Sequence, residues 1–238
     1  MTFIITLIAL VIERFFHWSH LRHWRWFYTF QQWLSHSRIH QFPSWALFLF
    51  CVLPLTVLVG IVDYFLSGWF YGILKIVWGV AVLLYCLGPT NLWVAANDQP
   101  FARTIFVAAN ERIFSVVFWF VVLGPMGAVF YRSTALMNPT SPLGLSQLAK
   151  TIQQWLDWIP VRLLTFMFAL GGHFTRVFSV FKKNALRGPE TNEVLLTECG
   201  MAALDATSEN AEEKDALALL DRVFVMALAI LAMVVLIL

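Results

Sequence analysis

The sequence predicts an all-α membrane protein: a polytopic bundle of five or six membrane helices, some of them short or re-entrant. Two observations predict this class. Hydrophobic residues make up 60% of the 238-residue chain, charged residues make up only 13%, and the mean hydropathy is +0.73. A soluble domain has about 45–50% apolar and about 25% charged residues. The apolar residues also form continuous runs, several of which approach the roughly 20 residues that a helix needs to cross a bilayer.

Six apolar segments account for the predicted helices. The second, third and fourth have the length expected of membrane spans. The first contains Glu13 and Arg14, and the fifth begins with Pro160 and Arg162. Each of these two is therefore expected to be a tilted span, a re-entrant helix or an interfacial helix. The last is expected to be a terminal span. The segments are 2–16, 45–66, 73–95, 113–131, 158–172 and 222–238.

The polar segments predict a division into three parts. Residues 1–172 are expected to form the membrane domain, in which 17–41 alternates aromatic and basic residues in a pattern typical of a helix at the lipid interface. Residues 173–221 contain five Lys and Arg residues and, after Gly188, most of the acidic residues of the chain. We expect this part to lie in the cytoplasm and to form an amphipathic helix near 191–205. Residues 222–238 are the predicted C-terminal transmembrane helix.

Three histidines are the candidate metal ligands. His17, His20 and His23 are spaced by three residues, so two of them can face one ion on a helix while the third is displaced by about 60°. The same pattern suits interfacial histidines among aromatic and basic residues. The three cysteines have unrelated spacings and predict no disulfide framework. The sequence identifies no cofactor.

Polar and charged residues at the ends of the apolar segments are the candidate ligand site. Gly124, Pro125 and Gly127 interrupt the fourth apolar segment, and they favour a kinked or broken helix packed against protein. Such a break can open a polar cavity, in which arginines bind a carboxylate or phosphate group. We therefore expect a pocket that opens toward the cytoplasm and is lined by Glu13, Asn97, Asp98, Arg103, Asn110, Glu111, Arg132, Asp157 and Arg162.

The expected partners follow from the same distribution of charge. The basic residues are dispersed at the helix ends, where lipid head groups hold them, so the lipid bilayer is the main partner and nucleic acid is not indicated. The pocket suits a small anionic ligand, either derived from peptidoglycan or a nucleotide. Monomer and homodimer both remain open.

Four stretches of the chain resemble the AmpE family, which belongs to a superfamily with the cobalamin-biosynthesis enzymes CobD and CbiB. The most specific is "LDWIPVRL", residues 156–163. In chain order the stretches are "ALVIERF", "ANERIFSVVFWFVVLGPMGAVFYRSTAL", "LDWIPVRLLTFMFALGGH" and "TNEVLLTECGMAALD". Together they span nearly the whole chain.

The resemblance implies a multi-pass inner-membrane protein of Gram-negative bacteria, a sensor or signalling modulator linked to beta-lactamase induction and peptidoglycan recycling. The related CobD-type enzymes form an amide with ATP and magnesium. Of their acid-rich stretch Glu-Asn-Thr-x-Asp-Gly only Asn110 and Glu111 stand here, and of their paired Asp only Asp157. The main expectation is thus a modulator without that chemistry. The alternatives are an amide-forming, nucleotide-dependent enzyme related to adenosylcobinamide-phosphate synthase, and a metal- or haem-binding membrane protein.

Overall fold

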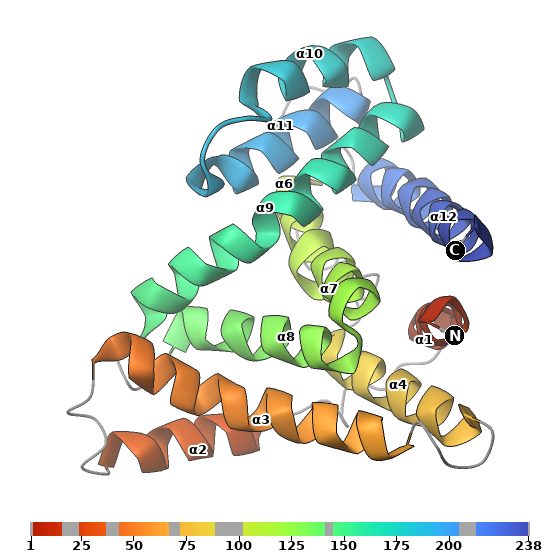
Figure 1. The fold of residues 1–238 in the computed structure, drawn as a ribbon. Helices are drawn as coiled ribbons and strands as arrows, with labels where there is room; N and C mark the ends of the chain where they lie inside the picture. The colour runs from red at the N-terminus through yellow and green to blue at the C-terminus, as the bar shows by residue number, and fades with distance from the viewer. Residues whose placement is uncertain are drawn as a thin grey trace. The chain divides into compact units, whose positions relative to one another are not determined.

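A computed structural model describes most of the chain, and every regular element in the described ranges is a helix (Figure 1). The all-α class predicted from composition is therefore confirmed. The chain divides into two compact units: Met1–Pro89 with Val116–Leu156, and Thr90–Ser115 with Asp157–Leu238. The described residues are 2–15, 24–36, 43–66, 72–88, 102–140, 145–204 and 213–237.

Three helices of the described ranges are long and apolar enough to cross a membrane. They are Ser44–Leu66, Ala102–Leu123 and Lys214–Val234. Their lengths of 23, 22 and 21 residues match the thickness of a hydrocarbon core, so the protein is a membrane protein. The expected total of five or six membrane elements is not confirmed. Ile73–Cys86 is apolar but shorter.

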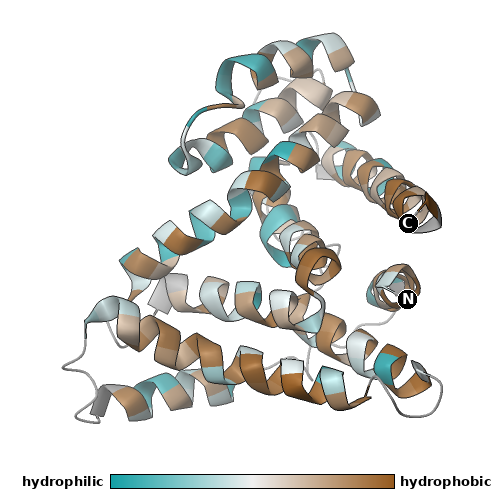
Figure 2. Cartoon of the chain, in the orientation of Figure 1, coloured by the Kyte–Doolittle hydropathy of each residue, from teal (hydrophilic) through white to brown (hydrophobic). Residues whose placement is uncertain are grey.

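Two predicted spans have different boundaries in the structure. The boundaries predicted for the fourth apolar segment, 113–131, are wrong, because the apolar helix begins at Ala102 and ends at Leu123. The terminal helix α12 (Glu213–Ile237) begins before the expected residue 222, since the apolar positions Ala216, Leu219 and Leu220 are buried and already belong to its packed face. In Figure 2 the ribbon of α12 is mostly brown, the colour of hydrophobic residues, toward its C-terminal end.

The first unit is built around α3 (Ser44–Leu66) and α8 (Pro125–Thr140), which pack on each other, while α4 (Ile73–Cys86) contacts α8 and α1 (Thr2–Phe15). Gly60 of α3 faces the flexible side chain of Met126. The structure describes only 24–36 of the predicted interfacial segment, and there α2 (Arg25–His36) carries Trp26, whose indole donates a 2.7 Å hydrogen bond to the Tyr85 hydroxyl.

The predicted helix break is confirmed in this unit. Helix α7 (Ser115–Leu123) ends at Gly124, which has a φ of 71°, and α8 begins at Pro125. Glycine adopts this left-handed conformation at little cost, and proline is well suited to the first helical position because it needs no amide donor there. A Cβ at Gly127 would overlap the carbonyl oxygen of Trp119, so this glycine permits the close approach of α8 to the end of α7.

The second unit packs α6 (Ala102–Ala109), α11 (Asn192–Leu204) and α12 together, with α10 (Phe174–Asn184) lying along α11 (Figure 1). Helix α11 lies where a helix is expected near 191–205, with Leu195, Leu196 and Cys199 buried, but its amphipathic character is not confirmed, since the apolar Val194 is exposed. Gly200 contacts the ring of Phe106, where an added Cβ would come within 2.5 Å of the ring carbon Cδ2. The ring of Phe106 lies 5.2 Å from that of Phe168 on α9 (Ser146–Gly171).

Candidate functional site

A wide helical turn at the sequence "NERIF" interrupts the candidate span Ala102–Leu123. Residues Asn110–Phe114 form a π-helical turn between α6 and α7, and the backbone amide of Ser115 donates to the carbonyl of Asn110, five residues earlier. In a regular α-helix these two side chains would point about 140° apart. The wider turn brings them to the same face of the helix. Such single π turns occur often at functional sites.

Three buried polar side chains meet beside this turn. The Ser115 hydroxyl lies 2.6 Å from Oδ1 of Asp157, and Nδ2 of Asn110 donates to the same oxygen at 3.2 Å. The Ser115 oxygen is also 3.2 Å from Oδ1 of Asn110. A hydroxyl has one proton, and the shorter distance to a carboxylate indicates that Ser115 donates to Asp157. We call these three residues the Asn110 cluster.

The Asn110 cluster joins two helices through groups that are almost inaccessible to solvent. Asn110, Ser115 and Asp157 are 2%, 0% and 6% exposed. A buried carboxylate is costly unless donors surround it, and here two donors are aimed at one oxygen. The cluster therefore fixes the position of α9 against the π turn, in a place where any loss of one partner leaves another polar group buried.

A second polar contact sits one turn away, at the proline of "LDWIPVRL". Pro160 lies inside α9 and has no amide proton, so the carbonyl of Leu156 loses its helical donor. The indole Nε1 of Trp119 donates to that carbonyl at 3.2 Å. Trp119 thus satisfies the acceptor that the proline releases, and α9 continues through the proline to Gly171.

Arg162 makes a dense set of hydrogen bonds at the other side of the proline. Its Nε donates to the carbonyl of Ala185 at 2.6 Å, and its two terminal nitrogens donate to the carbonyls of Trp158 and Arg187 at 2.7 and 2.8 Å. One terminal nitrogen also donates to Oδ1 of Asn192 at 2.9 Å. The guanidinium carbon lies 4.1 Å from the centre of the Trp158 ring.

These bonds give Arg162 a structural role. Burial lowers the pKa of Arg162, but an arginine remains a cation in proteins. Its charge is satisfied by three carbonyls and one amide oxygen, and its donors hold the segment 185–192 against α9. This segment contains the short 3-10 turn Pro189–Thr191, which leads into α11.

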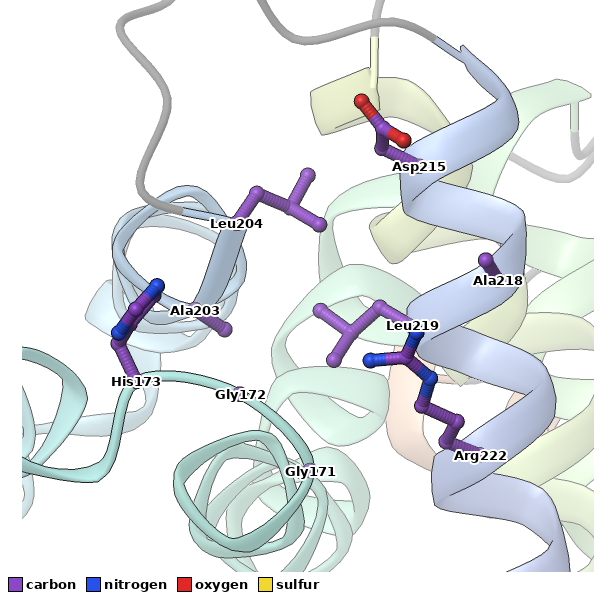
Figure 3. Close-up of a pocket in the computed structure, with 9 residues that line it drawn as sticks. All are labelled: Gly171, Gly172, His173, Ala203, Leu204, Asp215, Ala218, Leu219 and Arg222. Carbon is purple, nitrogen blue, oxygen red and sulfur yellow. The ribbon is translucent and has the colours of Figure 1, made fainter.

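A pocket of about 470 Å³ lies in the second unit, near the start of α12. Figure 3 shows Arg222 reaching from α12 toward the turn at Gly172 and His173, while Asp215 lies nearer the beginning of the helix. The size is within the range of small-molecule sites, about 300–1,000 Å³. The lining residues are Gly171, Gly172, His173, Ala203, Leu204, Asp215, Ala218, Leu219 and Arg222.

The structure brings together two of the predicted site residues, Asn110 and Asp157. Arg162 is engaged with the segment 185–192, Arg103 is exposed and Glu111 is half-buried. Asn97 and Asp98 lie outside the described residues, as do the candidate metal ligands at 17, 20 and 23. Within the described ranges, no group of three or more His, Cys, Asp or Glu residues is arranged to hold a metal ion.

Glu13 and Arg132 belong to the first unit, where both are buried, at 1% and 6% exposure. Burial of ionisable groups agrees with the expectation that they avoid lipid. The predicted meeting of all nine residues in one pocket stays a prediction.

Several contact residues have no clear signal in the sequence. Ser115 is five positions from Asn110, a spacing that an α-helical pattern does not place on one face. Trp119 reads as one more aromatic residue in an apolar run, and only the missing amide of Pro160 suggests that a donor is needed nearby. His173 and Arg222 are far apart in the sequence and meet only at the pocket.

Comparison with known proteins gives one family. The family model described as "Regulatory signalling modulator protein AmpE" matches residues 103–237, which is more than half of the chain. The match includes the Asn110 cluster, Arg162 and the pocket near α12. Neither the curated proteins nor the solved structures give a match.

Proposed function

The chain belongs to the AmpE family of regulatory signalling modulators, and from this premise we propose that it modulates the signal that leads to beta-lactamase induction. We place it as a multi-pass protein in the bacterial inner membrane, where it responds to peptidoglycan recycling. The observation that carries the proposal is the family match, which begins at Arg103 and extends through α12.

The Asn110 cluster supports a signalling role. A modulator needs an element with two arrangements of similar free energy. The cluster joins α9 to a π turn through two hydrogen bonds, from Asn110 and Ser115, to one carboxylate oxygen of Asp157. A π turn contains one residue more than the α-helical turn that it replaces, so the same sequence has a second regular conformation within reach. We propose that the cluster selects between these two conformations.

The pocket near α12 is the proposed place for the small anionic ligand. Arg222 lines it opposite the turn at His173, and a guanidinium group binds carboxylate or phosphate with two parallel hydrogen bonds. Asp215, on the same helix, is placed to accept a hydrogen bond from a donor group of the ligand. A ligand with both kinds of group agrees with a fragment of peptidoglycan, which carries carboxylates and amines.

The test measures beta-lactamase activity after exposure to an inducing beta-lactam, in a Gram-negative strain whose own copy of the gene is deleted. Asp157→Asn keeps the size of the side chain and removes its charge, and we expect it to fail to restore the induced level. Lys150→Gln is the matched control, because it neutralises an exposed residue of the same helix. Immunoblots of membranes report the amount of each variant.

Two further variants separate the cluster from the ligand pocket. Arg222→Gln is expected to weaken the response to the inducer while leaving thermal stability unchanged, because Arg222 is exposed. Ser115→Ala is expected to lower both the response to the inducer and the thermal stability. Full induction by Asp157→Asn, at a membrane level equal to that of the control, would contradict the proposed role of the cluster.

A further inference from the structure

Helix α10 combines three phenylalanines with three cations and contains no acidic residue. Its sequence is FTRVFSVFKKN, with Arg176 near the start and Lys182 and Lys183 in the last turn. Val177 is fully buried against the unit. Phe174 and Phe178 are instead 48% and 42% exposed, and their rings stack with centres 5.4 Å apart. Two neighbouring exposed phenylalanines on a short basic helix are unusual for a surface that meets only water.

The exposed apolar surface continues onto α9. Leu163, Phe166 and Leu170 are 41%, 42% and 49% exposed, and their spacing of three and four residues places them on one face of that helix. The ring of Phe166 lies 6.5 Å from that of Phe181, so the two helices share one apolar surface. We call it the α9–α10 face; it consists of Leu163, Phe166, Leu170, Phe174 and Phe178.

The position of α10 relative to α12 supplies the second observation. Lys214–Val234 is a candidate span, and its uninterrupted apolar part follows Arg222. Gly171, just before α10, packs on this boundary: an added Cβ would lie 3.0 Å from Cε of Met226 and 3.3 Å from Cγ2 of Val223. His173, which precedes the first residue of α10, lines the same pocket as Asp215 and Arg222 (Figure 3).

The beginning of α10 is therefore level with the transition of α12 from polar to apolar sequence. In a membrane protein this transition marks the depth of the lipid head groups. A helix at that depth with an apolar side, and with charged residues that are all cationic, has the composition of an in-plane interfacial helix. Figure 2 shows the alternation of apolar and polar residues along α10.

We propose that α10 lies in the head-group region of a leaflet that contains anionic lipids, with the α9–α10 face in contact with acyl chains. Arg176, Lys182 and Lys183 bind the phosphate groups. The charge of the helix selects this partner, because an anionic leaflet attracts clustered lysine and arginine side chains and a neutral protein surface does not. The inference does not depend on the proposed signalling function.

The test places a nitroxide label on the full-length protein in lipid nanodiscs. The background carries alanine at the native cysteines 51, 86 and 199, all of which are buried. Phe178→Cys puts the label on the α9–α10 face, and Ser179→Cys puts it one residue away on the cationic side. Power-saturation measurements then compare collisions with oxygen, which concentrates in lipid, and with a water-soluble nickel chelate.

In nanodiscs that contain phosphatidylglycerol, the label at 178 is expected to collide more with oxygen than with nickel, and the label at 179 to show the opposite. The triple variant Arg176→Gln, Lys182→Gln, Lys183→Gln is expected to shift the label at 178 toward water. Replacement of phosphatidylglycerol by phosphatidylcholine is expected to shift the label at 178 toward water as well.

Three results would overturn the proposal. Equal oxygen and nickel accessibility at 178 and 179 would show that α10 lies in water. Protection of 178 from both reagents, with dipolar broadening between labels, would show that a second copy covers the face. A label depth at 178 that is the same in both lipids, and in the triple variant, would show that anionic lipid does not hold the helix.

Discussion

Two of the prolines in the described helices, Pro125 and Pro160, have opposite effects on the helix. At Gly124–Pro125 the chain leaves the helix, with a φ of 71° at Gly124, and starts a new helix in another direction. At Pro160 the helix α9 continues from Ser146 to Gly171. Both prolines lack an amide proton. The neighbouring residues, and not the proline, therefore decide whether the helix ends.

The difference lies in what happens to the released carbonyl. At Pro160 the carbonyl of Leu156 accepts the indole N–H of Trp119, so no polar group is left without a partner. At Gly124 the glycine turns the chain away, and its own carbonyl caps the next helix by accepting from the amide of Gly127 at 3.0 Å. Helix α9 thus passes through its proline at a point where Trp119 supplies a donor.

The largest expected effect is at Gly127. In Gly127→Val the new side chain overlaps the carbonyl oxygen of Trp119, which belongs to the backbone and cannot move alone. We expect a loss of about 3 kcal/mol or more in the free energy of unfolding, measured by denaturation in mixed detergent micelles. Gly60→Ala is the matched control: its Cβ meets only the flexible side chain of Met126, and we expect a smaller loss.

Removal of the Trp119 donor is expected to rank second. Trp119→Phe leaves the Leu156 carbonyl without the indole, so unfolding becomes easier by about 1–3 kcal/mol. Trp155→Phe controls for loss of an indole on α9, because Trp155 is 63% exposed. Equal thermal midpoints for the two variants would mean that the indole does not stabilise the proline step.

Gly124→Ala tests the turn alone. An added Cβ would meet no atom within 4 Å, so the cost is only that of the left-handed conformation, about 1 kcal/mol. The same denaturation assay measures it. If Gly124→Ala were as damaging as Gly127→Val, crowding rather than backbone conformation would govern the break.

The smallest effect is expected for Pro160→Ala, and its value lies in combination with Trp119→Phe. Alanine restores an amide donor to Leu156, so the single variant is expected to change stability by less than about 1 kcal/mol. The cost of Trp119→Phe should fall by about 1 kcal/mol in this background. Strictly additive losses would show that the two groups do not share the carbonyl.

Much of the fold follows from composition and from the helix-breaking residues. The all-α class, the helix near 45–66, the break at 124–127 and the presence of a helix near 191–205 agree with the sequence predictions. Each depends on interactions between residues close in sequence. The boundary of the second span could not be predicted, because the polar triplet Asn110, Glu111 and Arg112 suggests a helix end but lies inside the helix.

The candidate site is harder to predict from the sequence than the fold, for a physical reason. Asn110 and Asp157 were both predicted from their polarity, but their contact depends on a π turn that shifts every later side chain around the helix. Because of the same shift, an α-helical pattern does not place Ser115 beside Asn110. Arg162 was predicted to bind an anion, whereas its partners in the structure include three backbone carbonyls, which no residue type reveals.

The π turn at Asn110–Phe114 makes the chain one residue longer than the helix around it requires. If that extra residue were absorbed elsewhere, everything beyond Ser115 would turn by about 100° and slide by about 1.5 Å along the axis. Trp119 would then leave the Leu156 carbonyl, and the proline of α9 would lose its donor. A single surplus amino acid thus couples the contacts of Asp157 to the hydrogen bond that Trp119 donates beside Pro160.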